Sequence, residues 1–372
     1  MYDILSKLAI SPYLFYSPKE EQNKIKYEVI KKAFSHHYDN NGYYKALCTE
    51  SNVSPEDIQG PEDLNKIPLI PISYFKKPDS HVLLTSPIDK IEYEMRSTGT
   101  SGVPSVSRRD YDTCNNAALT LLSLYRNFFQ ISKGVCLYFC PSPYEMPEMG
   151  MVKALNILNC ALDRSEFVVE NMRFDSEKAL KLLKEWEGKF TRYIMGPPFL
   201  LNTFCDFLKR KDIKIKLDSE TKIITIGGWK RYTGKQIPRK ELNKKCVEYL
   251  GVEPGQIRDM YGLVEANQLS IECEHNHKHV PPCLHISIRN SCDPAQEVEE
   301  GKHGLIAILD PSSLSYPCYI LTEDVGFMKK NVQCSCGRIS DVIEIIGRAP
   351  KSETGCCAVS LEKYLDQAES KE

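Results

Sequence analysis

Apolar residues near the N-terminus recur at the spacing of a buried helix face. The positions on this face are Ile25, Val29, Ile30, Ala33 and Phe34. They predict an amphipathic packing helix that ends at the Asn-Asn-Gly break of residues 40–42. Neighbouring side chains on a helix point about 100° apart, so His36 and His37 are interpreted as structural rather than metal-binding.

From about residue 96 onward, short apolar runs alternate with amphipathic stretches. The runs that predict strands are 134–139, 193–196 and 222–226, and residues 177–186 predict a helix. Further short strands are expected at 285–288, 304–309 and 318–321. This alternation predicts an α/β fold with a largely parallel sheet covered by helices, in which ligands collect beyond the carboxyl ends of the strands. The Gly-Pro-Pro segment at 196–198 and the glycine pair at 227–228 fall at such ends, although plain strand termination is the alternative.

A run of hydroxyls and glycines directly follows the predicted strand at 91–95. It consists of Ser97, Thr98, Gly99, Thr100, Ser101 and Gly102. Small flexible residues after a strand let backbone N–H groups close around phosphate oxygens, which favours a nucleotide site. Residues 103–105 follow where a P-loop would place lysine, so this loop is a different kind of phosphate clasp. An ordinary turn between two strands is the alternative interpretation.

Three further motifs follow in a fixed order, at residues 223–228, 261–265 and 321–326. Together with 97–102 they resemble the motifs of acyl-adenylate-forming enzymes. Within that superfamily the chain is most similar to the acyl-protein synthetases of the bacterial luciferase fatty-acid reductase system. That similarity rests on residues 98–103, 227–230, 256–259, 278–282, 315–317 and 357–361.

The resemblance implies the large N-terminal domain of the adenylate-forming fold, with mixed and parallel sheets flanked by helices. We expect an N-terminal helical region over 1–95, a first α/β subdomain with the phosphate loop over 96–215, a second α/β to β-rich subdomain over 216–346, and a tail over 347–372. Only 24 residues follow Arg348 in a chain of 372, too few for the C-terminal lid domain and its lysine.

The resemblance also implies roles for single residues. Residues 97–102 would hold the β- and γ-phosphates of ATP, and Glu265 would associate with Mg²⁺, for which a carboxylate is a suitable hard ligand. Asp324 matches the acidic residue that accepts hydrogen bonds from the ribose hydroxyls, and Arg348 matches an arginine near the ribose and phosphate. The residues expected around the adenine are Gly227, Gly228, Tyr261 and Gly262. Solvated loop carboxylates and a core tyrosine are the alternatives.

The tail contains Cys357, which aligns with the cysteine that acyl-protein synthetases acylate. A thiolate is a strong nucleophile toward an acyl-adenylate, and the nearby Gly355 favours a tail that can swing. The family pattern has glycine immediately before this cysteine, whereas Cys356 stands there in this chain, so which sulfur reacts is open. Two cysteines packed in a terminal element are the alternative.

Another set of residues has the composition of a four-ligand zinc site. It consists of Cys273, His279, Cys334 and Cys336, with His275, His277 and Cys283 as rival ligands. We interpret it as a structural staple between the loop after Glu265 and the loop after Asp324. The pattern is more like the phenylacetate-CoA ligase branch, and free cysteines near a surface histidine cluster are the alternative.

Composition narrows the remaining classes. The 48 basic and 50 acidic residues give a net charge of −2, so nucleic acid is not an expected partner. No export signal or long apolar run is apparent, and the 15 cysteines form no disulfide framework, so a cytoplasmic protein with no membrane span is expected.

The resemblance therefore implies an enzyme that uses ATP and Mg²⁺ to activate a carboxylic acid, favouring a fatty acid. It would accept the acyl group on Cys357 and pass it to an acyl-reductase partner. Two alternatives are an aryl- or acyl-CoA ligase with its lid domain supplied in trans, and a catalytically silent zinc-containing binding module.

Overall fold

The computed structural model describes residues 12–97, 103–228 and 237–349. The α-helices are α2 (Lys19–Asn40), α3 (Gly42–Glu50), α4 (Tyr111–Phe129), α5 (Gly150–Asn156), α6 (Ser176–Glu185), α7 (Pro198–Arg210) and α8 (Arg239–Leu250). Short 3₁₀ helices are η1 (Pro12–Tyr16), η2 (Pro55–Asp57), η3 (Pro61–Lys66), η4 (Ile72–Lys76), η5 (Ser80–Leu83), η6 (Ile88–Lys90), η7 (Ile157–Ala161) and η8 (Pro254–Gln256).

The strands of the first half are β1 (Ile70–Pro71), β2 (Ile91–Arg96), β3 (Val106–Asp110), β4 (Val135–Tyr138), β5 (Arg164–Phe167), β6 (Val169–Glu170), β7 (Arg173–Phe174) and β8 (Arg192–Gly196). Those of the second half are β9 (Ile223–Ile226), β10 (Ile257–Tyr261), β11 (Ser270–Glu272), β12 (Lys278–His279), β13 (His285–Arg289), β14 (Gly304–Leu309), β15 (Tyr319–Gln333) and β16 (Ile339–Arg348). The predicted helix at 177–186 and the predicted strands at 91–95, 134–139, 193–196, 222–226, 285–288 and 304–309 are confirmed to within a few residues. The short strand expected at 318–321 is instead the first part of the 15-residue strand β15.

One mixed sheet joins most of these strands in the order β13-β14-β15-β16-β12-β11-β10-β9-β8-β4-β5, with β1 added beside β15. Strands β5, β4, β8, β9 and β10 run parallel to one another. From β10 through β11, β12, β16, β15 and β14 to β13 each pairing is antiparallel. The parallel sheet predicted from the alternating pattern is thus one half of a larger mixed sheet, which runs across the boundaries expected at 215 and 346.

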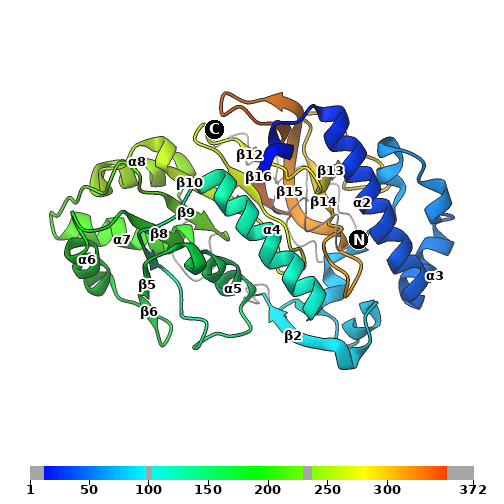
Figure 1. Ribbon diagram of the computed structural model, residues 1–372, viewed down its shortest axis with the longest axis horizontal. Coiled ribbons are helices and arrows are strands. Elements are labelled where there is room, and N and C mark those ends of the chain that lie inside the picture. Colours follow the sequence, from blue (N-terminus) through cyan, green and yellow to red (C-terminus); the bar gives the residue numbers. More distant parts are fainter. Residues whose placement is uncertain (1–11, 98–102, 229–236, 350–372) are drawn as a thin grey trace.

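Each face of the parallel half has its own covering helices. Cys136 and Tyr138 of β4 pack with α4 and α5, whereas Val135 and Leu137 pack with α6, α7 and α8. This alternation follows from the two-residue period of a strand buried on both faces. In Figure 1, α6, α7 and α8 gather at one end of the molecule, and α4 crosses the region between them and α2.

The predicted N-terminal helix is α2, which packs on the antiparallel half. Val29, Ile30 and Phe34 are fully buried in a cluster with residues of α3, β1 and β15. His37 lies 2.7 Å from the Thr85 hydroxyl and 3.1 Å from the Ser313 carbonyl, which fits the structural interpretation of the histidine pair. No helix in the described ranges has the length and apolarity needed to cross a membrane.

Candidate active site

A cavity of about 1050 Å³ lies at the carboxyl ends of the parallel strands. Pro198 after β8, Gly227 and Gly228 after β9, and Gly262 after β10 all line it. Gly227 has a φ of 77°, in the left-handed region that favours glycine, so the chain turns away from β9 without a side chain obstructing the cavity. This cavity lies at the edge of the sheet where the sequence predicts a ligand site.

Three predicted nucleotide residues meet at one end of this cavity. The Tyr261 hydroxyl donates to Asp324 Oδ2 at 2.9 Å, and Arg348 Nε donates to Asp324 Oδ1 at 3.3 Å. The antiparallel pairing of β15 with β16 sets Asp324 opposite Arg348. Burial raises the pKa of the Asp324 carboxyl, and Arg348 and Tyr261 oppose that shift. The result is an ionisable carboxylate at the cavity wall, held in place and able to accept hydrogen bonds from a cis-diol.

Glu265 lines the same cavity from the loop between β10 and β11. Its side chain is almost fully buried and is hydrogen-bonded by Ser105. Burial raises the pKa of its carboxyl, and no lysine or arginine of the described ranges forms an ion pair with it. A buried carboxylate that faces a cavity without a cationic partner fits a site for a bound cation.

The backbone of this loop is held from two sides. The Tyr316 hydroxyl donates to the Glu265 carbonyl at 2.7 Å and contacts the Ser107 hydroxyl at 2.6 Å. Arg109, which is buried on β3, donates to the carbonyls of residues 264 and 266 at 2.6 and 3.3 Å. The 315–317 motif therefore supports the glutamate, and neither Arg109 nor the function of Tyr316 was anticipated from the sequence.

The structure brings most of the predicted nucleotide residues together. Ser97 lines the cavity, and its backbone N–H donates to the Ser105 carbonyl at 3.0 Å while its hydroxyl accepts from Ser105 N at 2.9 Å. These bonds join the first residue of the predicted phosphate loop to Ser105, three residues beyond the end of that loop. The remainder of that loop (Thr98, Gly99, Thr100, Ser101 and Gly102) and the tail cysteines Cys356 and Cys357 lie outside the described residues.

The part of the cavity lining that comes from α4 and α5 was not recognised in the sequence; we call it the apolar arm, because its residues other than Lys153 are apolar. From α4 it is lined by Cys114, Ala117, Ala118 and Leu121, and from α5 and η7 by Gly150, Lys153, Ala154 and Ile157. Both sets follow the spacing of one helix face, which is the signal that the sequence offered. The Tyr125 hydroxyl donates to the Ala154 carbonyl at 3.1 Å and joins the two helices.

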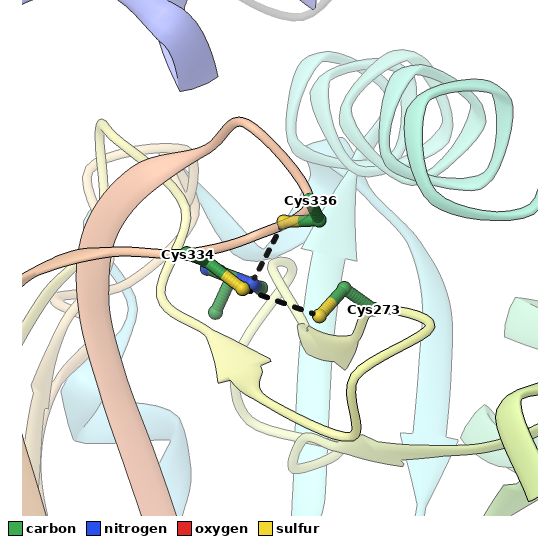
Figure 2. A group of neighbouring side chains, drawn as sticks. Cys273, Cys334 and Cys336 are labelled. Atoms are coloured by element: carbon green, nitrogen blue, oxygen red, sulfur yellow. Dashed lines mark hydrogen bonds between the residues drawn. The ribbon is translucent and has the colours of Figure 1, made fainter.

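The predicted zinc ligands converge outside this cavity. One ligand atom from each of Cys273, His279, Cys334 and Cys336 lies within 4.8 Å of the others. Figure 2 shows the three sulfurs turned toward one another. Zn–S bonds of about 2.3 Å at tetrahedral angles place two sulfurs about 3.8 Å apart, and the Cys273 and Cys334 sulfurs are separated by 3.8 Å. Cys336 Sγ lies 3.5 Å from His279 Nε2.

The surroundings of the cluster also suit a metal. His279 Nδ1 contacts the Ser340 hydroxyl at 2.7 Å, which leaves Nε2 directed at the sulfurs. Burial lowers the pKa of His279 to about 3, so its imidazole is neutral. Two similar turns present the thiols: Cys273 N donates to the carbonyl of residue 277, and Cys334 N to that of residue 338, both at 3.0 Å.

The alternative zinc ligands considered from the sequence, His275, His277 and Cys283, are not members of this four-residue cluster. Cys283 instead donates to Gln268 Oε1 at 3.0 Å, and His275 is exposed. His277 Nδ1 lies 3.2 Å from Cys334 Sγ, which suits a hydrogen bond to a ligand sulfur.

The fold is that of adenylate-forming ligases. A structure of 2-hydroxyisobutyryl-CoA ligase in an open conformation, with 2-HIB-AMP and CoA, matches with a TM-score of 0.67 and 14% identity, covering 92% of this chain and 79% of that one. The same enzyme in its postadenylation state with R3-HIB-AMP gives a TM-score of 0.69 and 14% identity, covering 91% and 70%.

The chain belongs to the LuxE acyl-protein synthetase family, whose family model matches residues 4–366. The long-chain-fatty-acid–luciferin-component ligase of Aliivibrio fischeri is 28% identical over 364 residues, covering 94% of this chain and 90% of the relative. The Vibrio harveyi enzyme of the same name is 27% identical, covering 92% and 89%. The protein is therefore a ligase, which sets aside the hypothesis of a catalytically silent binding module.

Proposed function

We propose that this ligase activates a long-chain fatty acid with ATP and then accepts the acyl group on Cys357. A carboxylate oxygen attacks the α-phosphorus of ATP, so that a new O–P bond forms, the bond to the β-phosphate breaks and pyrophosphate leaves. The Cys357 thiolate then attacks the acyl carbonyl, forming the C–S bond of a thioester and releasing AMP. A partner acyl reductase is the proposed recipient of the acyl group.

The observation that carries this proposal is that a polar end and an apolar arm share one cavity. The polar end holds Tyr261, Asp324, Arg348 and Glu265, which suit the ribose and phosphates of ATP. The apolar arm between α4 and α5 suits a hydrocarbon chain, because burying methylene groups against apolar side chains is favourable. The names of the two relatives support a long-chain fatty acid as the substrate class.

Two metal ions form part of the proposal. Glu265, as a buried carboxylate without a basic partner, would hold Mg²⁺ directly or through water, and the ion would neutralise phosphate charge. The Cys273, His279, Cys334 and Cys336 set would hold a structural Zn²⁺. Because Cys334 and Cys336 lie in the turn between β15 and β16, this ion would fix the hairpin that carries Asp324 and Arg348 at its other end.

The test is incubation with radiolabelled dodecanoate and ATP, comparing wild type with Cys356→Ser and Cys357→Ser. We expect stable label on wild type and on Cys356→Ser, removable by neutral hydroxylamine, and none on Cys357→Ser. Label lost only from Cys356→Ser would move the acceptor to that sulfur. Release of dodecanoyl-CoA at an undiminished rate by Cys357→Ser with coenzyme A would instead support the CoA ligase alternative.

A further inference from the structure

The basic residues around the cavity are matched by acceptors, with one exception among those that the structure describes. Six basic residues line the cavity, and five of them have an acceptor. Four form ion pairs: Lys76 with Glu323 at 3.1 Å, Arg96 with Glu94 at 3.4 Å, Arg348 with Asp324 at 3.3 Å, and Arg239 with Glu272. The fifth, Arg109, donates hydrogen bonds to the carbonyls of Val264 and Ala266. The sixth is Lys153, for which no carboxylate or carbonyl partner is found in the described ranges. Its ammonium is therefore available to an anionic ligand.

Lys153 is also held in a defined place. It is half-buried on α5, and its Nζ lies 4.4 Å from the centroid of the Tyr93 ring on β2. A cation over an aromatic face is attracted by the ring quadrupole, yet it keeps its capacity to donate hydrogen bonds. Tyr93 therefore orients the ammonium without neutralising it.

The position of Lys153 connects the two chemical regions of the cavity. One turn before it, α5 begins beside β2, where Arg96 N donates to the Glu148 carbonyl at 2.7 Å. Gly150 packs so tightly against Val264, next to Glu265, that a Cβ there would lie 2.6 Å from a Val264 methyl carbon. In the other direction, Ala154 and Ile157 continue the same helix face into the apolar arm.

We propose that Lys153 is a positioning residue that binds the substrate carboxylate, with the acyl chain extending into the arm between α4 and α5. This inference rests on the proposed function. A fatty acid has one anionic end and an apolar tail, and α5 presents one free cation followed by apolar residues on the same face. The charge pair would hold the attacking oxygen at the junction between the arm and the Glu265 loop.

The experiment measures acid-dependent exchange of labelled pyrophosphate into ATP for wild type, Lys153→Met, Lys153→Gln and Lys153→Arg. Loss of a charge-assisted hydrogen bond predicts a KM for dodecanoate about 10- to 100-fold higher in the Met and Gln variants, with the KM for ATP within about twofold. Lys153→Arg should restore most of the affinity. Lys184→Met removes an exposed lysine of α6 and is the matched control, expected to behave as wild type.

A second arm separates carboxylate binding from a structural role. Dodecanoyl-AMP has no free carboxylate, so wild type and Lys153→Met should transfer its acyl group to the protein at equal rates. An unchanged KM for dodecanoate, an equal rise in the KM for ATP, or slower transfer from dodecanoyl-AMP would each overturn the assignment. Absence of exchange in wild type with any acid would overturn the proposed function itself and this inference with it.

Discussion

Replacing Asp324 with asparagine should weaken ATP binding while leaving the fold intact. The side chain keeps its shape, but one carboxylate oxygen becomes an amide donor and the negative charge is lost. In Asp324→Asn the side chain accepts one hydrogen bond from a ribose diol instead of the two that the carboxylate accepts. Hydrogen bonds to charged groups contribute about 1.5–3 kcal/mol each, so we expect ATP to bind roughly 10- to 150-fold more weakly.

The cost to folding should be small for two reasons. The Arg348 side chain that pairs with Asp324 is 55% exposed, and such pairs contribute about 0–1 kcal/mol. Burial also raises the pKa of Asp324, so its charge is held less favourably in the folded protein without ligand than in the unfolded chain. The neutral asparagine avoids that penalty.

The assay is a calorimetric titration with ATP, combined with thermal unfolding of the unliganded proteins. Asp89→Asn makes the same chemical change on the exposed η6 helix and should bind ATP as wild type does. Wild-type affinity in Asp324→Asn would refute the assignment of Asp324 to the ribose. Equal loss of affinity and of folding stability would indicate that the carboxylate acts on the fold alone.

Three other predictions follow from the same geometry. Glu265→Gln should abolish pyrophosphate exchange yet stabilise the unliganded protein. Burial raises the pKa of Glu265 above its ordinary 4.5, so the stability of the wild type falls as the pH rises through the pKa of Glu265 in the folded protein. Urea unfolding should therefore show that the substitution raises the free energy of unfolding more at about pH 8 than at about pH 4. Cys334→Ser should lower both the zinc content, measured by plasma emission spectrometry, and the unfolding temperature. The control Cys283→Ser should retain the zinc. Full zinc content in Cys334→Ser would contradict the assignment of Cys334 as a zinc ligand. Tyr316→Phe removes the hydrogen bond that the Tyr316 hydroxyl donates to the Glu265 carbonyl. It should lower the free energy of unfolding by about 1–3 kcal/mol in urea titrations. An unchanged unfolding midpoint would contradict a role of this hydrogen bond in holding the Glu265 loop.

Part of the parallel sheet could be predicted because three of its strands are short, mainly apolar runs bounded by turn residues, whereas β5 and β10 carry charged residues and were not recognised. The runs that became β4, β8 and β9 were recognised in this way, and Gly227 marked where β9 ends. The joining of the parallel and antiparallel halves could not be predicted, because it depends on the pairing of β12 with β16. β12 has only two residues, and β16 lies far from it in the sequence.

The candidate site residues that belong to a sequence motif could be predicted, whereas those whose position depends only on packing could not. Asp324 and Glu265 came from motifs, and the structure places both in one cavity. Lys153 belongs to no motif. It is recognised as an anion-binding candidate only because the other basic residues that line the cavity have acceptors in the structure. Sequence spacing also could not choose between Cys336 and Cys283 as a zinc ligand, since only the turn after β15 brings the former to the cluster.

Exchange of labelled pyrophosphate into ATP is the decisive measurement, because it reports whether this protein joins a carboxylic acid to AMP. With Mg²⁺ present and coenzyme A absent, we expect exchange that requires a long-chain fatty acid and disappears in Glu265→Gln. Exchange that no carboxylic acid stimulates, or that is undiminished in Glu265→Gln, would contradict it.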